Sequence, residues 1–361
     1  MTELTAMLAS RPPKKRSGYR IAALAALMLL VAIASLAIGP VLIAPGRVMG
    51  VLADALTGTL PRDTQTAREA IVVLDLRLPR TVLGLLVGAA LAVSGAILQG
   101  IFRNPLADPI FVGISPGAAF AAVSWIVLGY SVAALLPAWA ARFGLTLAAF
   151  AGAFLITLIL QRFSSRAGHT SMATLLFTGI ALGALAQAGT GFLLFLASDQ
   201  QLREFTFWTL GSLGGGTWNK VAMAAPFALL AFVLAAPLAR GLDALALGEA
   251  EAFHVGVDVE RLKRRAIIAV ATAVGASVAV AGVIGFVGLV VPHLLRLMIG
   301  PSHKTLLIGS ALLGGALLVG ADVVARMVAG PAELPLGVVT AALGAPYFLW
   351  LLNRYRAALG G

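Results

Sequence analysis

Long apolar runs separated by short polar stretches make up most of the chain from residue 21 onward. A helix needs about 20 apolar residues to cross the core of a bilayer, and about ten runs come close enough to this length to span. The runs lie at 21–43, 81–101, 110–129, 143–160, 172–197, 219–239, 266–284, 285–299, 305–321 and 336–352. This pattern predicts an all-α polytopic membrane protein, with one transmembrane domain at 21–354 between polar tails at 1–20 and 355–361.

The composition agrees with this pattern and narrows the class of protein. Hydrophobic residues make up 60% of the chain and charged residues 11%, with a mean hydropathy of +0.98, whereas soluble domains are about 45–50% apolar and about 25% charged. These values exclude a soluble enzyme, a disordered chain and a fibrous protein. The net charge of +11 could suggest nucleic acid, but the apolar content argues against that partner. The chain has no cysteine, which excludes disulfides, thiolate metal sites and a cysteine nucleophile.

The distribution of charge predicts the orientation in the membrane. A basic tail precedes the first apolar run, which is long enough to be a retained helix rather than a signal peptide. With the N-terminus inside, the inner segments carry 17 of the 26 basic residues and 7 of the 15 acidic ones. Because cytoplasmic segments of membrane proteins are enriched in Lys and Arg, both termini are expected in the cytoplasm.

Two segments of the chain resemble each other. VGAALAVSGAI at 87–97 and VGASVAVAGVI at 274–284 share seven of eleven residues, and Pro105 matches Pro292 at the same offset of 187. Because the two segments would cross the membrane in opposite directions, they predict an inverted repeat, which is common in transporters. The alternative is chance similarity, since Gly, Ala and Val dominate both segments.

Several kinds of chemistry are missing from the sequence. It holds no GxxxxGK[ST] phosphate loop, so nucleotide hydrolysis is not assigned to this chain, and it holds no HExxH or GxSxG motif. Of the four histidines, none is expected within a span and none has a second metal ligand at suitable spacing. Carboxylates are scarce in the apolar runs, which argues against ion-coupled secondary transport. The chain is therefore expected to be a conduit that needs another protein for energy.

The longest polar stretch between apolar runs, residues 242–265, is a candidate binding site for that protein. We call it the coupling segment. It is expected to hold a short helix at Ala244–His254 and a second short helix that Asp258 caps, with Glu260 and Arg264 paired at i,i+4. Composition leaves two interpretations open, a docking element for a cytosolic partner and an ordinary solvated loop.

Motifs in a fixed order make most of the chain resemble the FecCD-type permeases of ABC importers for iron-siderophores, heme and cobalamin. The motifs are LRLPR at 76–80, SGAILQGIFRNPLADPIFVGISPGAA at 94–119, LGSL at 210–213, LALGEAEAFHVGV at 245–257, GFVGLVVPHLLR at 285–296, AD at 321–322, and ELPLGVVTAALGAPYFLWLL at 333–352. The resemblance implies the type II ABC importer permease fold in a bacterial inner membrane, with the lipid around it.

The resemblance also implies partners. The permease is expected to be a homodimer with the path along its two-fold axis. Two cytosolic ATPase subunits, which hold ATP and Mg, would bind below, and a periplasmic binding protein would deliver the cargo from above. The chain itself would hold no cofactor or metal and would not be an enzyme.

By position in the motifs, three arginines are expected to dock the binding protein. These are Arg77 and Arg80 of LRLPR and Arg326 after the AD motif. Arginine and carboxylate form oriented, charge-assisted contacts, which suit docking. The alternative for any one of them is anchoring at the membrane interface.

The resemblance assigns two further groups of residues at the inner face. The coupling segment matches the helices that seat on the ATPase, and the stretch before the fifth helix matches the cytoplasmic gate. The coupling residues are Leu247, Gly248, Glu249, Ala250, Val255, Gly256, Val257 and Arg264, and the gate residues are Thr170, Ser171, Met172 and Ala173.

The cargo is expected to be heme, because LREFTFWTLGSLGGGTW at 202–218 looks most like the heme permeases and because Met172 and Ala173 are apolar. An iron-siderophore is the second expectation and cobalamin the third. An ion-coupled secondary transporter and an integral membrane enzyme are the alternatives from other classes.

Overall fold

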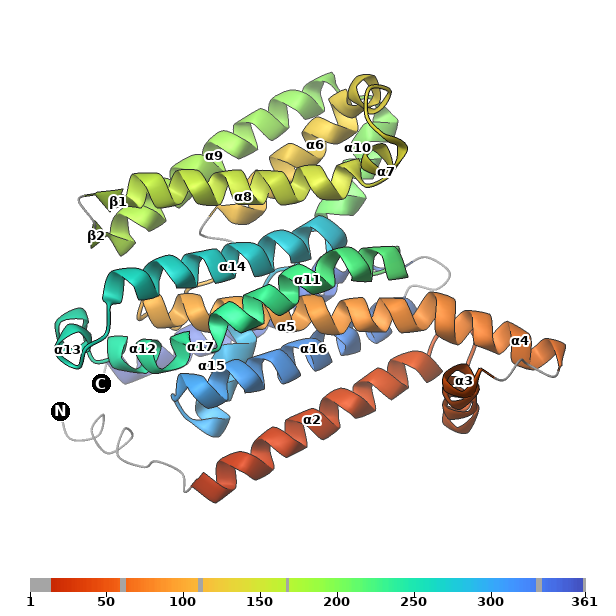
Figure 1. Ribbon diagram of the computed structural model, residues 1–361, viewed down its shortest axis with the longest axis horizontal. Coiled ribbons are helices and arrows are strands. Elements are labelled where there is room, and N and C mark those ends of the chain that lie inside the picture. Colours follow the sequence, from red (N-terminus) through yellow and green to blue (C-terminus); the bar gives the residue numbers. More distant parts are fainter. Residues whose placement is uncertain (1–13, 59–62, 110–112, 167–168, 329–332, 360–361) are drawn as a thin grey trace.

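The computed structural model describes residues 14–58, 63–109, 113–166, 169–328 and 333–359, and over these residues the chain is almost entirely helical (Figure 1). The helices of the first half are α2 (Lys14–Ala37), α3 (Pro45–Thr57), α4 (Thr64–Ala70), the π-helical η1 (Ile71–Arg77), α5 (Leu78–Ile101), α6 (Ile114–Ala133), α7 (Ala138–Arg142) and α8 (Gly144–Ser164). A hairpin of β1 (Ser165–Arg166) and β2 (His169–Thr170) follows. The remaining helices are α9 (Met172–Leu196), α10 (Asp199–Thr209), α11 (Trp218–Ala235), α12 (Leu238–Leu245), α13 (Glu249–His254), α14 (Val259–Ala281), α15 (Val287–Ile299), α16 (His303–Val328) and α17 (Leu336–Leu359).

The described residues include seven helices that are long and apolar enough to cross a membrane. They are Gly18–Ala37, Thr64–Ile101, Gly144–Ser164, Met172–Leu196, Trp218–Ala235, Val259–Ala281 and His303–Val328. Three shorter apolar helices, Ile114–Gly129, Val287–Ile299 and Leu336–Trp350, complete the set. Each of the ten predicted runs corresponds to one of these helices, so the predicted all-α polytopic fold is confirmed.

The core of the bundle is built around α5, which is buried on nearly all sides and packs against α11, α14, α15 and α16. A helix that is apolar all round is stable only when it is enclosed in this way. Two glycines let the neighbouring backbones approach: a Cβ on Gly88 would overlap the carbonyl oxygen of Gly314, and one on Gly95 would overlap that of Gly288. Together α4, η1 and α5 form one continuous helix, Thr64–Ile101.

The two similar sequence segments lie in the centre of the molecule. Residues 87–97 belong to α5, and residues 274–284 cover the end of α14 and the turn after it, where Gly282 has a φ of 72°. The helices α5 and α14 pack against each other and run in opposite directions (Figure 1). This arrangement agrees with the predicted inverted repeat.

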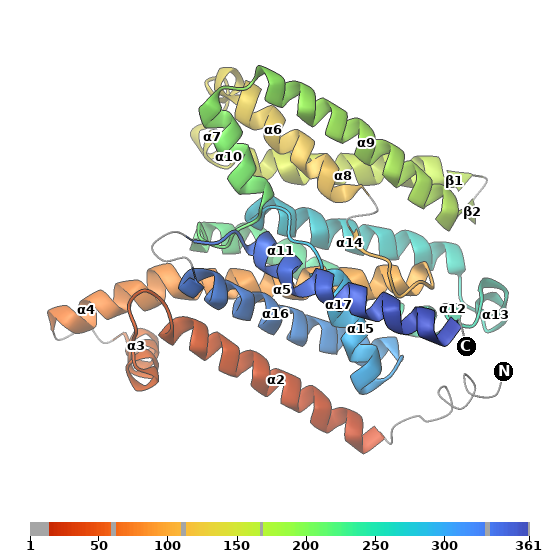
Figure 2. The same cartoon turned by 180° about the vertical axis from the view of Figure 1, so that it is seen from behind.

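The bundle has two distinct ends. One, which we call the hairpin end, holds β1, β2, α12 and α13, and both the start of α2 and the end of α17 lie there (Figures 1 and 2). The other, which we call the α4 end, holds α3, α4, α7 and α10. The two chain ends therefore share one side of the bundle, as the predicted topology requires.

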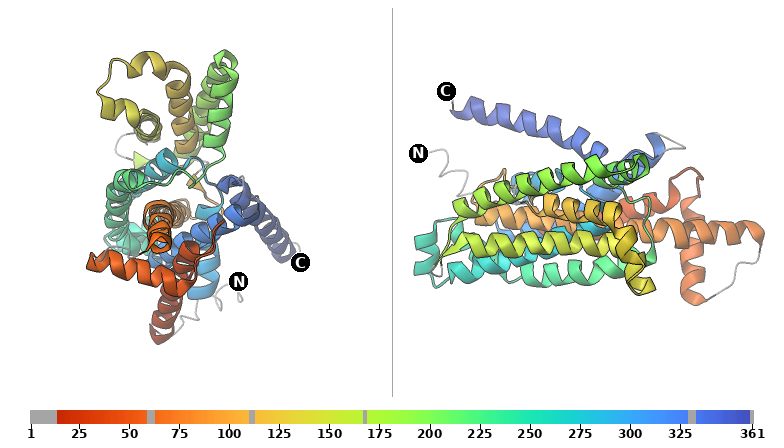
Figure 3. Two further views of the ribbon diagram at one scale, coloured as in Figure 1. Left: turned by 90° about the vertical axis from the view of Figure 1, so that its right-hand side faces the viewer. Right: turned by 90° about the horizontal axis from the view of Figure 1, so that it is seen from above.

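The helices α9 and α17 lie on the same face of the bundle (Figures 2 and 3). In the single chain α9 presents large apolar side chains to the exterior: Phe177, Ile180, Leu185, Phe192 and Phe195 are between 54% and 84% exposed. An apolar face of this size is typical of contact with lipid, with another protein chain or with an apolar ligand.

Candidate functional site

The three arginines predicted to dock a binding protein lie together at the α4 end. Arg77 ends η1, Arg80 lies in the first turn of α5, and Arg326 lies in the last turn of α16. All three are buried, with exposed fractions of 5%, 9% and 6%. Segments 240 or more residues apart therefore bring their guanidinium groups to one place.

Arg80 pairs with two carboxylates of the same chain. Its Nη2 atom donates to Asp322 Oδ1 at 2.8 Å, and its Nη1 atom donates to Glu333 Oε1 at 2.6 Å. Asp322 is also paired with Arg326, with 3.2 Å between Oδ2 and Nε. The Asp322 side chain is buried, whereas that of Glu333 is 42% exposed. Glu333 is thus the member of this cluster that solvent reaches.

Arg77 and Arg326 hold the end of α2. Arg77 Nη1 donates to the carbonyl oxygens of Leu36 at 2.7 Å and Ala37 at 3.0 Å, in the last turn of that helix. Arg326 Nη2 donates to Ser35 Oγ at 2.9 Å. The last carbonyl groups of a helix have no partners within it, and a guanidinium satisfies them well.

The arginine cluster therefore ties α2, α5 and α16 together within the chain. Asp322 and Glu333, its internal partners, were not predicted, although Asp322 and Arg326 are spaced i,i+4 in a helix. Docking by these arginines stays a prediction. Because they are buried, charge reversal at Arg77 or Arg326 is expected to destabilise the fold as well as any docking site.

The coupling segment holds the end of α12, the short helix α13 and the start of α14 at the hairpin end, and these helices differ from the predicted limits. The predicted helix Ala244–His254 is wrong, because α12 ends at Leu245 and α13 begins at Glu249. Gly248 causes the break, because its backbone φ of 137° is one that residues other than glycine rarely adopt.

The surface of the coupling segment is apolar at several points. Leu247 is 75% exposed, Phe253 is 72% and Val255 is 69%. Ala250 and Arg264 are also exposed, whereas Val257 is half-buried. Exposed apolar side chains beside charged ones are typical of a surface that binds another protein.

The second part of the coupling segment is a long helix. Asp258 caps α14 as predicted, and its Oδ1 accepts the N–H of Arg261 at 3.0 Å. The helix is not short, since it continues for 23 residues to Ala281. Glu260 is paired not with Arg264 but with Lys263, at 3.4 Å, and its other oxygen accepts the N–H of Thr170 at 2.7 Å.

The predicted gate residues lie beside the coupling segment. Thr170 is in β2 and is buried, and Ser171 caps α9 by accepting the N–H of Thr174 at 3.2 Å. Met172 is half-buried against the core, and Ala173 is exposed. The structure therefore brings the candidate gate and the candidate coupling residues to one place at the hairpin end.

A further hydrogen-bonded pair of side chains joins α12 to the start of α16. Asp243 Oδ1 accepts the backbone N–H of His303 at 2.7 Å and lies 2.7 Å from its Nδ1 atom. Burial acts to raise the pKa of Asp243, but the hydrogen bonds from His303 outweigh it and hold the pKa below its ordinary value. This contact fixes α12 against the bundle.

One expectation about the histidines is wrong. His293 lies in the middle of the apolar helix α15 rather than outside the apolar segments, and it is 4% exposed. Its ring packs edge-on to Tyr347 of α17, with 6.2 Å between the centroids.

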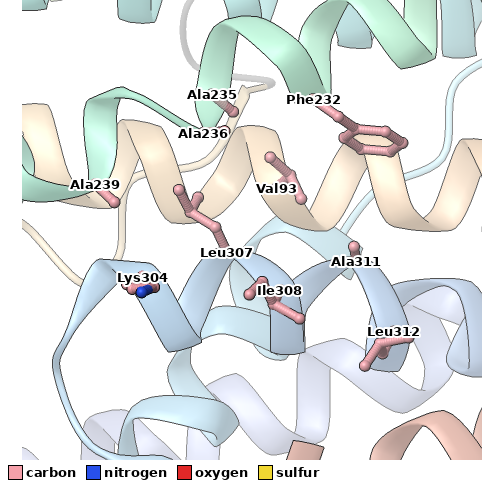
Figure 4. Close-up of a pocket in the computed structure, with 10 residues that line it drawn as sticks. All are labelled: Val93, Phe232, Ala235, Ala236, Ala239, Lys304, Leu307, Ile308, Ala311 and Leu312. Carbon is pink, nitrogen blue, oxygen red and sulfur yellow. The ribbon is translucent and has the colours of Figure 1, made fainter.

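Two apolar pockets lie away from the candidate gate. One, of about 390 Å³, lies between α5, α11, α12 and α16 and includes Phe232 and Leu307, with Lys304 at its hairpin-end edge (Figure 4). The other, of about 1020 Å³, lies between α6, α8 and α9. Residues 170–173 line neither pocket.

Comparison with known proteins identifies the family. The FecCD transport family matches residues 27–354. The chain belongs to this family. It is 47% identical to the hemin transport system permease protein HmuU of Yersinia pestis over 288 residues, which are 80% of this chain and 85% of that protein. It is 41% identical to the vitamin B12 import system permease protein BtuC of Salmonella typhi over 346 residues, which are 96% of this chain and 98% of that protein.

Two further similarities extend the picture. A cobalamin import system permease protein BtuC of Halobacterium salinarum is 45% identical over 283 residues, covering 78% of this chain and 73% of that one. A solved structure assigned to the metal-chelate type ABC transporters, in an inward-facing conformation, matches with a TM-score of 0.80 and 30% identity, and covers 93% of this chain and 99% of that one. This FecCD protein is therefore a multi-span ABC importer permease, and its family is one of transporters rather than enzymes.

Proposed function

We propose that this permease imports heme from the periplasm to the cytoplasm of a bacterium, through a path formed between two copies of the chain. The observation that carries the proposal is the exposed apolar surface of α9, the helix that begins within the candidate gate. Heme is flat and largely apolar, so it matches such a face better than a highly polar chelate does.

The nature of this face also fits a conduit. No histidine occurs in α9 that could ligate heme iron, so heme would pass by weak apolar contacts. Weak contacts favour release, because a tight ligand bond would slow the exit of the cargo. The similarity to the hemin permease of Yersinia pestis supports the same substrate.

Cobalamin is the second candidate. Permeases named for cobalamin or vitamin B12 import are 41–45% identical, and the Salmonella typhi protein matches 96% of the chain. An iron-siderophore is the third, supported by the similarity to the structure of the metal-chelate type.

We further propose that the hairpin end faces the cytoplasm and seats two ATPase subunits, which hold the ATP and Mg. The exposed apolar side chains of Leu247, Phe253 and Val255 support this assignment. The α4 end would then face the periplasm and receive the binding protein.

Docking of the binding protein would involve Arg80 through its outer partner. Because Glu333 is 42% exposed and Asp322 is buried, a carboxylate of the binding protein could replace Glu333 on Arg80 while Asp322 stays in place. In this proposal Arg77 and Arg326 support the docking site by holding α2.

The test is uptake by proteoliposomes that contain the permease, its ATPase and its binding protein. ATP-dependent uptake of heme, but not of ferric siderophore or cobalamin, is the expected result, and ATP replaced by a non-hydrolysable analogue is the control. Uptake of cobalamin or siderophore alone would reject heme as the cargo. Accumulation by permease-only vesicles under an ion gradient would instead identify a secondary transporter.

A further inference from the structure

Lys263 lies where three separate segments of the hairpin end meet. These are α13, the first turn of α14, and the hairpin that precedes α9 (Figure 1). The side chain is 3% exposed, and its Nζ atom donates to Glu249 Oε2 at 2.8 Å, to the carbonyl oxygen of Thr170 at 3.0 Å and to Glu260 Oε1 at 3.4 Å. An ammonium group has three N–H donors. Here the three acceptors lie in the hairpin, in α13 and in the first turn of α14.

The arrangement holds Thr170 on both sides of its backbone. The Thr170 N–H donates to Glu260 Oε2 at 2.7 Å, while the Thr170 carbonyl oxygen accepts from Lys263. Thr170 also pairs with Ser165 in the hairpin, and the next residue, Ser171, caps the N-terminus of α9. Because the bonds to Lys263 and Glu260 are charge-assisted, they are among the stronger contacts available to a backbone segment.

Glu249 is the outer arm of the same cluster. It is the first residue of α13, and its side chain is 46% exposed, whereas those of Lys263 and Glu260 are 3% and 29% exposed. Within α13 only Ala252 is buried, so few apolar contacts hold this helix in place. Beyond its neighbours α12 and α14 in the chain, α13 is linked to the hairpin before α9 through the bond between Glu249 and Lys263.

We propose that Lys263 is the positioning residue that transmits movement of α13 to the start of α9. The proposal rests on the proposed function, in which α13 seats on the ATPase and residues 170–173 form the gate. A change of position at Glu249 moves the Lys263 ammonium, and this movement displaces the Thr170 carbonyl and the first turn of α9. The connection is direct, since it passes through one side chain and crosses no flexible loop.

Three variants separate this role from simple stabilisation of the fold. Lys263→Met keeps an unbranched side chain that is one heavy atom shorter and removes all three bonds. Glu249→Gln removes only the charge on the outer arm and leaves Thr170 bound to Lys263 and Glu260, so it remains informative if Lys263→Met does not fold. Lys304→Met is the matched control, because Lys304 is an exposed lysine at the same end for which the described residues provide no ion pair.

The first measurement uses the permease alone. Amide hydrogen exchange of residues 164–175 should be at least about tenfold faster in Lys263→Met, since the loss of hydrogen bonds to charged groups weakens a segment by at least this factor. The exchange should be unchanged in Lys304→Met.

The second measurement uses the complete transporter. The chain has no cysteine, so Ala173→Cys places one spin label per copy on the exposed gate residue Ala173. The distance between the two labels is measured with and without ATP and vanadate, whereas uptake is measured on protein without the cysteine.

In labelled protein with Lys263 and Glu249 intact, and in the Lys304→Met control, the distance between the labels should change on vanadate trapping. In Lys263→Met and Glu249→Gln this change should be lost or at least halved. Uptake per ATP hydrolysed should fall severalfold in the same two variants. A full distance change together with normal uptake per ATP in both would overturn the role of Lys263, as would unchanged exchange at 164–175 in Lys263→Met. A wild-type complex that takes up none of the three candidate cargoes would instead overturn the proposed function, and the exchange result would still stand.

Discussion

Arg80 and Asp322 form a buried, two-point ion pair although 242 residues separate them along the chain. The Arg80 Nε and Nη2 atoms donate to the Asp322 carboxylate at 2.9 Å and 2.8 Å. A parallel pair of bonds of this kind fixes distance and angle together. The pair sets the register of α5 against α16 at the α4 end and supplies the frame on which Glu333 and Arg77 are placed.

Removing Asp322 should destabilise the protein strongly. In Asp322→Ala the buried Arg80 and Arg326 lose their shared carboxylate, and breaking a buried pair from one side costs about 3–5 kcal/mol. Thermal unfolding in detergent measures the loss. Glu69→Gln is the control, because the pair of Glu69 with Arg47 is at the same end and involves a half-exposed arginine, and such pairs contribute about 0–1 kcal/mol. Equal stability of the two variants would contradict the structural role of Asp322.

Glu333→Gln should tighten docking of the binding protein if Arg80 takes part in it. The amide competes less well for the guanidinium than the carboxylate does, so the binding protein's carboxylate would face a weaker rival. We expect an affinity several times higher, measured by titration of the binding protein onto permease in nanodiscs. Weaker or unchanged binding would remove Arg80 from the docking site, and Glu69→Gln again provides the comparison.

Gly95→Ala should disrupt the core. A methyl group at this position would overlap the Gly288 carbonyl oxygen, and two backbones must separate to admit it. Overpacking of this kind costs roughly 1–3 kcal/mol, which should appear as a lower unfolding temperature. Gly50→Ala in α3 is the matched control, since nothing lies within 4 Å of the added methyl group and alanine favours a helix. A neutral Gly95→Ala variant would show that α5 and α15 are not in close contact.

The pair of Asp243 and His303 should make stability depend on pH in acid. The folded-state pKa of Asp243 is lowered from its ordinary value of 3.8, so the folded state favours the ionised carboxyl group. The contribution is complete above pH 3.8 and is lost as the pH falls through the lowered pKa. The unfolding temperature of the wild type should therefore fall more steeply below pH 3.8 than that of Asp243→Asn. Parallel profiles for the two proteins would contradict this role.

The sequence predicted those parts of the structure that depend only on residues close together in the chain. The ten apolar runs were found because a membrane span requires an uninterrupted length of apolar residues, and Asp258 was identified as a cap because a cap needs only its own helix. The inverted direction of the repeat followed from counting spans.

The contacts between distant segments were not predictable in this way. Glu260 and Arg264 have the spacing of an ion pair within a helix, which is typically worth only about 0.2–0.5 kcal/mol. In the structure Glu260 instead meets a backbone N–H 90 residues earlier in the chain, and nothing in its own segment indicates that contact. Lys263 was counted only as one basic residue of the inner face, because burial of a lysine does not show in the sequence.

The family motifs located the arginines correctly at one end but did not reveal their internal partners. LRLPR and AD were both recognised, yet the motifs carry no information on which groups lie opposite each other in space. For this reason the motifs could not indicate that Arg77 and Arg326 hold the end of α2.

The unbroken helix from Thr64 to Ile101 has a consequence for the whole molecule. At 1.5 Å per residue its 38 residues extend for roughly 55 Å, whereas the apolar core of a bilayer is about 30 Å thick. The helix therefore reaches well beyond the lipid at the α4 end, while at its other end Gly100 lies directly against His303. One continuous backbone thus links the arginine cluster at the α4 end to the start of α16 at the hairpin end, so a force on either end of this helix is carried along a single element.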